Sequence, residues 1–164
     1  MRILREKGFK VKGLFYNPNI HPFSEYLRRK DTLNILNRKV NLEIFYPEYR
    51  VEDFFRKVNL SEEKNRRCPL CWELRLENTA EFALKNGFDF FSTTLLVSPY
   101  QDQGLIKKIG EEIAQRKGIK FYYEDFRAGF KQAHREAKEE GLYCQNYCGC
   151  IYSEIERCRY SAKS

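Results

Sequence analysis

Two close-set pairs of cysteines constrain the fold of this chain more than any other feature. The sequence holds six cysteines, all between Cys68 and Cys158, and four of them form Cys68-Pro-Leu-Cys71 and Cys148-Gly-Cys150. Thiolates are soft ligands, and two pairs from distant segments can meet at one metal site. A chain that uses its cysteines in this way has to fold so that the two segments lie side by side.

The cellular compartment decides which chemistry paired thiols can perform. The opening residues, MRILREKGFKVKG, are charged and lack the apolar core of a signal peptide. No run approaches the roughly 20 apolar residues that cross a membrane. We therefore expect a cytoplasmic protein without a membrane partner. Thiols stay reduced there, so Cys68 and Cys71 are predicted to bind metal or do redox chemistry, with a buried reduced pair as the alternative.

The remaining cysteines and the ligand spacing leave the identity of the metal open. Cys144 and Cys158 are interpreted as spare residues, although Cys144 lies near enough in sequence to compete as a ligand. The second pair is Cys-x-Cys, so the spacing matches neither a zinc ribbon nor a bacterial ferredoxin. Zinc and iron–sulfur both remain possible on the spacing alone.

Positive charge is concentrated in the part of the chain without cysteines. Residues 1–67 contain 16 Lys and Arg against 9 Asp and Glu, whereas residues 68–164 contain 14 of each, and the net charge is +7. A basic surface beside a thiol site favours a polyanionic partner such as nucleic acid. A solvated basic face without a partner is the alternative.

The order of hydrophobic patterns predicts one α/β domain over residues 1–164. Short aromatic and β-branched runs predict strands, and amphipathic patterns between them predict helices. The strands are expected at 11–16, 42–46, 88–96 and 119–123, and the helices at 24–38, 51–58, 71–86, 105–117 and 130–140. Alternating strands and helices predict a parallel sheet flanked by helices, followed by a C-terminal cysteine-bearing segment.

Three unusual segments follow predicted strands, at 17–22, 98–102 and 125–130. Ligands of parallel sheets bind beyond the carboxyl ends of the strands, so we expect these segments at one edge. Asp102 could ligate a metal, donate a proton or cap the next helix. Arg127 could hold a phosphate or pair with Asp125. His21 is expected to be a loop or surface residue rather than a ligand.

Aromatic side chains near the same edge offer surfaces for nucleic-acid bases. Tyr16 and Tyr100 could stack on bases, although most aromatic residues in a chain this rich in them are expected in the core. The sequence contains no Gly-rich phosphate loop and no Ser/His/Asp nucleophile arrangement.

At this point five segments resemble a known family. The sequence is similar to the QueH-type epoxyqueuosine reductases from about residue 8 to residue 157, in FYNPNIHPFSEY (15–26), RCPLCWELRLENTAEFA (67–83), STTLLVSPYQD (92–102), YYEDFRAGF (122–130) and YCQNYCGCIYSEIER (143–157). The resemblance implies a Rossmann-like (HUP-like) sheet. It also implies a cobalamin-independent enzyme that reduces epoxyqueuosine to queuosine at the wobble position of tRNA.

The resemblance further implies a set of site residues. A [4Fe-4S] cluster and an additional iron ion are expected on Cys68, Cys71, Cys148 and Cys150, with Asp102 as a non-thiol ligand and catalytic residue. The anticodon stem-loop of tRNA is expected to contact Tyr16, Asn17, Tyr100 and Arg127. An unidentified electron donor is the other implied partner.

One departure from the family accompanies these matches. Family members begin with a strand and a Cys-Cys turn, whereas this sequence opens on what looks like the end of a helix, so we expect the 164-residue form to bind iron poorly and to be inactive. Two rival functions remain at this stage. One is a non-enzymatic RNA-binding module with a structural four-cysteine zinc site, and the other is a dithiol oxidoreductase that uses Cys68 and Cys71 alone.

Overall fold

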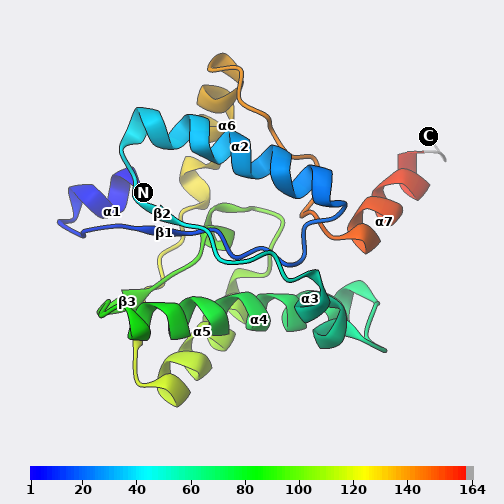
Figure 1. Ribbon diagram of the computed structural model, residues 1–164, viewed down its shortest axis with the longest axis horizontal. Helices are drawn as coiled ribbons and strands as arrows, with labels where there is room; N and C mark the ends of the chain where they lie inside the picture. Colours follow the sequence, from blue (N-terminus) through cyan, green and yellow to red (C-terminus); the bar gives the residue numbers. More distant parts are fainter. Residues whose placement is uncertain (162–164) are drawn as a thin grey trace.

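The computed structural model describes residues 1–161, with side chains through residue 159, and has an α/β architecture (Figure 1). In chain order the elements are α1 (Arg2–Glu6), β1 (Gly13–Leu14), α2 (Phe23–Val40), β2 (Ile44–Phe45), α3 (Val51–Val58), α4 (Lys64–Lys85), β3 (Phe90–Phe91), the 3₁₀ turn η1 (Thr94–Val97), α5 (Gln103–Lys117), β4 (Lys120–Phe121), the 3₁₀ turn η2 (Arg127–Gly129), α6 (Phe130–Glu139) and α7 (Ile151–Ser161).

All four predicted strands form, but they are shorter than predicted and make two sheets. β1 pairs with β2, and β3 pairs with β4, both in parallel. The third predicted strand ends at Phe91, because the chain then turns into η1, where the Thr93 hydroxyl accepts a hydrogen bond from the Leu95 N–H. The β1–β2 sheet runs between α2 and α4 (Figure 1).

The helices largely follow the predicted patterns, with two differences. α3 has the predicted bounds, and α5 ends at Gly118, whose φ of 72° lets the chain leave the helix. α4 begins at Lys64 rather than near Cys71, and Pro69 lies inside it. α7 was not predicted at all.

Two clusters of buried side chains hold the elements together. The larger lies between α4, α5, β3 and η1, and includes Trp72, Leu76, Leu96 and Ile106. The smaller consists of Phe54, Val58 and Cys150, with Cys71 and Leu74 packed against it. A predicted ligand, Cys150, is therefore part of the core.

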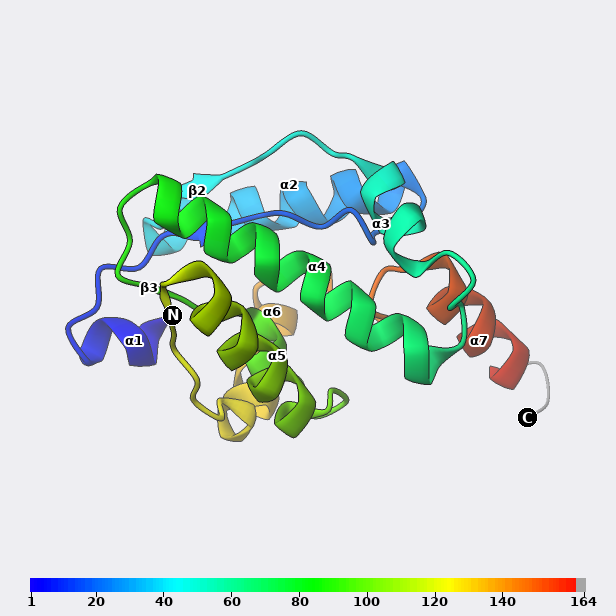
Figure 2. The same ribbon diagram turned by 90° about the horizontal axis from the view of Figure 1, so that it is seen from below.

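The ends of the described chain lie at opposite ends of the molecule (Figures 1 and 2). α1 is at one end, and α7 is at the other, close to where α2 begins. Within residues 1–161, none of the helices combines the length and the apolar character that crossing a membrane requires.

Candidate metal and substrate site

Cys68 and Cys71 lie inside helix α4, in its second and third turns. Cys68 packs against the larger core cluster and Cys71 against the smaller one. Burial raises the pKa of Cys68, and it raises the pKa of Cys71 to about 12. Because the helix begins at Lys64, neither thiol lies at its N-terminus, and burial favours the neutral thiol at both positions.

Cys148 and Cys150 form a tight pair on either side of Gly149. Their Sγ atoms are 3.6 Å apart, and the Ser153 N–H donates a hydrogen bond to the Cys150 Sγ at 3.3 Å. The hydrogen bond with Cys150 lowers the pKa of Cys148 to about 5, and the same contact raises that of Cys150. The pair therefore carries one negative charge more readily than two.

The fold brings the two cysteine pairs into one region, as predicted. Cys71 packs against the cluster that contains Cys150, and a charge on Cys148 acts on both Cys68 and Cys71. Two cations border the region. Arg67 lies beside Cys68 and Cys150, and Arg75 lies beside Cys71 and Cys148.

The four thiols suit a soft metal chemically, and the distance between the Cys148 and Cys150 sulfurs suits one as well. Two thiolates bound at about 2.3 Å to one tetrahedral ion lie about 3.8 Å apart, and the Cys148 and Cys150 sulfurs are separated by 3.6 Å. Within residues 1–159, however, no three Cys, His, Asp or Glu side chains are already gathered as a metal site. A metal would have to draw the thiols of α4 and of 148–150 closer together.

The Cys148-Gly-Cys150 turn is held by the N-terminal half of the chain. The Arg29 guanidinium is buried and donates to the carbonyl oxygens of Tyr147 and Cys148, each at 3.1 Å. The His21 N–H donates to the Gly149 carbonyl at 2.8 Å. Sequence patterns did not identify Arg29, because an arginine on an amphipathic helix normally faces solvent.

His21 is in the predicted loop but not at the surface. Only 6% of it is exposed, and its ring stacks on Phe55. Its Nδ1 accepts a hydrogen bond from the Ile151 N–H at 3.3 Å, at the start of α7. The prediction that His21 is a loop residue is confirmed, and the surface alternative is wrong.

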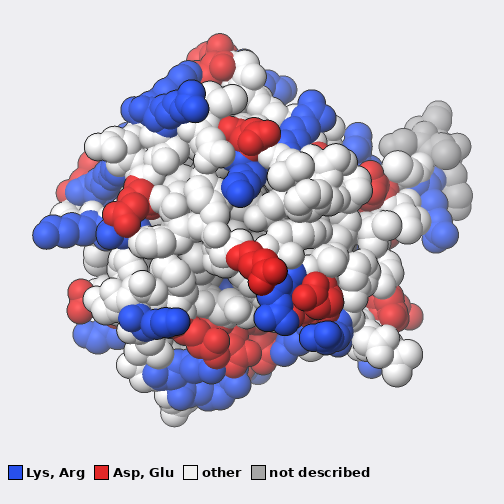
Figure 3. Space-filling model, in the orientation of Figure 1, with Lys and Arg blue, Asp and Glu red and all other residues white. Residues whose placement is uncertain are grey.

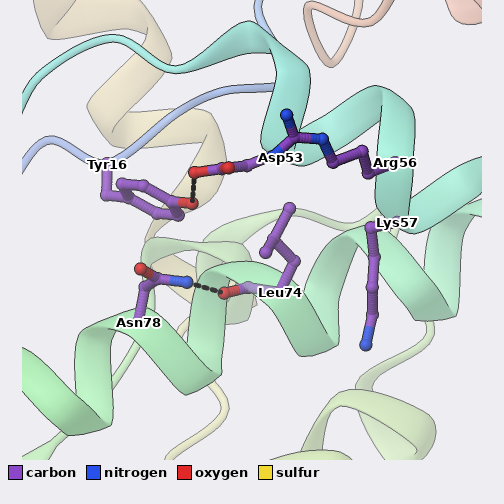
Figure 4. A pocket seen from close by; sticks show the side chains of 6 residues that line it. All are labelled: Tyr16, Asp53, Arg56, Lys57, Leu74 and Asn78. Atoms are coloured by element: carbon purple, nitrogen blue, oxygen red, sulfur yellow. Dashed lines mark hydrogen bonds between the residues drawn. The ribbon is translucent and has the colours of Figure 1, made fainter.

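Two of the four predicted substrate residues lie beside the cysteines. Asn17 Oδ1 accepts a hydrogen bond from Arg75 at 3.0 Å, and Arg75 in turn contacts Cys71. Tyr16 donates to Asp53 Oδ2 at 3.3 Å (Figure 4). Sequence analysis missed Arg75, although its position one helical turn after Cys71 places both on one face of α4.

The other predicted residues lie around η1 and η2. Asp102 caps α5, because its Oδ1 accepts a hydrogen bond from the Leu105 N–H at 2.9 Å. Of the three roles that the sequence left open for Asp102, this contact matches the helix cap. Arg127 pairs with Asp125 at 2.5 Å, which holds the pKa of Asp125 at about 2. Tyr100 is 79% exposed and packs edge-on against Phe130.

The positive charge does not form a single patch on the face shown in Figure 3. Lys and Arg side chains gather in several groups, mostly toward the rim, with Asp and Glu side chains between them. Part of the excess charge of residues 1–67 is also inside the protein, because Arg29 and Arg67 are buried.

The sequence also matches a family of known proteins over most of its length. Residues 1–156 match the family described as "Epoxyqueuosine reductase QueH". A protein of that name from Dehalococcoides mccartyi is 36% identical over 93% of this chain and 84% of its own length. One from Thermotoga maritima is 39% identical over 87% of this chain and 79% of its own. This chain therefore belongs to the epoxyqueuosine reductase QueH family and is an oxidoreductase.

Proposed function

We propose that this epoxyqueuosine reductase works without cobalamin and holds its metal on Cys68, Cys71, Cys148 and Cys150. The observation that carries the proposal is the convergence of two distant cysteine pairs in a chain of this family. A [4Fe-4S] cluster with an additional iron ion fits these soft donors, with Asp102 as a further ligand. Such a group supplies single electrons and a Lewis acid for the epoxide oxygen.

The reaction sets what the side chains around the metal have to do. Converting an epoxide to an alkene takes two electrons and two protons and releases the oxygen as water. The electrons come from a partner that remains to be identified. A proton donor is needed near the leaving oxygen, and Asp102 is proposed for that role.

Arg75 and Asn17 are proposed to position the reacting group. The Arg75 guanidinium contacts both Asn17 and Cys71, so it lies between the strand-end loop and the thiols. A fixed cation at this point stabilises negative charge on oxygen as a C–O bond opens. Tyr16, Tyr100 and Arg127 are proposed to contact the anticodon stem-loop, whose unpaired bases can stack on aromatic rings.

We also propose a fold type and a cellular location for this chain. Both sheets are parallel and both are built from strands joined through helices, which supports a Rossmann-like (HUP-like) arrangement with the cysteines near the strand ends. A reduced four-thiol site supports a cytoplasmic location.

Metal analysis of protein isolated without oxygen tests the proposal. Iron together with acid-labile sulfide and broad visible absorbance is the expected result. One zinc per chain and a colourless protein would instead support a structural zinc site. A metal-free protein with a reversible Cys68–Cys71 disulfide would indicate dithiol chemistry.

A further inference from the structure

A hollow of about 480 Å³ opens beside the cysteines, between the loop after β1 and helices α3 and α4 (Figure 4). Volumes of about 300 to 1,000 Å³ are usual for sites that bind small molecules or single nucleotides. The residues around the hollow come from three elements, and they are Tyr16, Asp53, Arg56, Lys57, Leu74 and Asn78. None of these except Tyr16 was expected to contact a ligand.

The hollow is adjacent to the thiol site. Leu74 lines it and packs against the same small cluster as Cys71 and Cys150. Tyr16 lines it as well, and the next residue, Asn17, is hydrogen-bonded to Arg75 beside the thiols. A molecule that reaches the cysteines with one end can therefore extend into the hollow with another.

The charged groups around the hollow leave one cation available for a ligand. Asp53 accepts a hydrogen bond from Tyr16 and pairs with Arg50 at 3.5 Å. Lys57 Nζ pairs with Glu73 at 2.7 Å, and Figure 4 shows its side chain pointing down past α4. The exposed Arg56 extends above Asp53 toward the side of Tyr16 and has no ion pair within residues 1–159.

We propose that this hollow binds the RNA backbone next to the reacting nucleotide, with the Arg56 guanidinium on a phosphate and Tyr16 and Asn78 against the sugar or base. The proposal rests on the proposed function in one respect, which is that the RNA presents its modified nucleotide to the cysteines. The planar guanidinium can donate two parallel hydrogen bonds to a phosphate, and Asn78 offers its amide oxygen to a hydroxyl. A backbone contact of this kind adds affinity without reading the sequence.

Binding measurements on an unmodified anticodon stem-loop RNA test the proposal without requiring metal or turnover. We expect Arg56→Gln to weaken binding about tenfold. The slope of log affinity against log salt should fall by about 0.7, because one phosphate contact to a single strand is lost. Arg56→Lys, which keeps the charge, should recover part of the affinity, and circular dichroism should show that all variants are folded.

A matched control comes from an arginine outside the hollow. Arg135 on α6 is also exposed and pairs only loosely with Glu139, at 4.0 Å. Arg135→Gln should stay within about twofold of wild type and keep its salt slope. Equal losses in Arg56→Gln and Arg135→Gln, or no RNA binding by the wild-type chain, would overturn the proposal. Turnover that persists with equal losses would leave the reductase assignment standing.

Discussion

Gly149 shows how much of the thiol site depends on one residue. Its φ is +112°, a conformation that side chains with a Cβ rarely adopt, and an added Cβ would lie 2.9 Å from Ile20 Cγ1 and 3.1 Å from an Arg29 nitrogen. The glycine therefore serves two purposes. It lets the turn form, and it lets the N-terminal half approach the turn closely.

The Gly149→Ala substitution should lower the free energy of unfolding by about 1 to 3 kcal/mol, the usual cost of holding a residue in a disfavoured conformation. Urea unfolding measures this change. Gly129→Ala is the matched control, because Gly129 has an ordinary φ of −82° and a Cβ there would contact nothing within 4 Å. Equal stability of the two variants would show that the turn tolerates a side chain.

The residues of the site divide into those that local sequence can identify and those that it cannot. Cysteine spacing predicted the four thiols, Tyr16 was predicted as an aromatic surface for bases, and the family resemblance predicted Asn17. Arg29 and Arg75 were missed because their partners lie far away in sequence, on the 147–148 carbonyls and on Asn17. For Asp102, the sequence left three roles open, and the structure shows the cap.

At the scale of elements, helix α2 acts as a support for the cysteine turn. Arg29 forms an ion pair with Glu25, and their side chains are 8% and 10% exposed. The same guanidinium holds two backbone carbonyls of the turn. One buried residue of α2 thus connects the basic half of the chain to Cys148.

Arg29→Met should destabilise the protein by about 3 kcal/mol, because the substitution removes the ion pair with Glu25 and the side-chain donor to the Tyr147 carbonyl, and leaves the Cys148 carbonyl with Asn19 Nδ2 at 3.4 Å. This loss of stability is at the lower end for breaking a buried ion pair, because the Tyr143 hydroxyl still donates a hydrogen bond to Glu25. Urea unfolding of Arg28→Met provides the control. Arg28 is exposed and lies over the Tyr143 ring, so its loss should cost less than about 1 kcal/mol. A smaller loss in Arg29→Met than in Arg28→Met would contradict this role of α2.

Most elements could be predicted from the sequence because their signals are local. Amphipathic periodicity and glycine stops located α3 and α5 well. α4 starts earlier than predicted, and its first turn carries the buried Arg67, which donates to Glu156 of α7 at 3.0 Å, a contact with no local signal in the sequence. The strands were predicted too long, because β-branched and apolar residues also occur where the chain packs without pairing, as in 92–96.

At the scale of the whole molecule, the basic part of the chain, residues 1–67, has to fold together with the cysteine-bearing part, residues 68–164. Residues 1–67 supply the supports of the site, namely the 17–22 loop, α2 and α3, and residues 68–159 supply the cysteines. The positive charge of the first part is thus used partly inside the protein, where Arg29 pairs with Glu25, and is partly exposed at the surface, as at Arg56. Composition alone could not separate these two uses.

Conversion of epoxyqueuosine to queuosine in tRNA, followed by mass spectrometry of the released nucleosides, tests the central claim most directly. The assay uses anaerobically reconstituted wild-type protein that converts the nucleoside, and compares its cysteine variants with it. Cys68→Ala and Cys150→Ala should each abolish the loss of one oxygen atom from the nucleoside, whereas Cys158→Ala should turn over normally. Normal turnover by Cys68→Ala or Cys150→Ala would contradict the account.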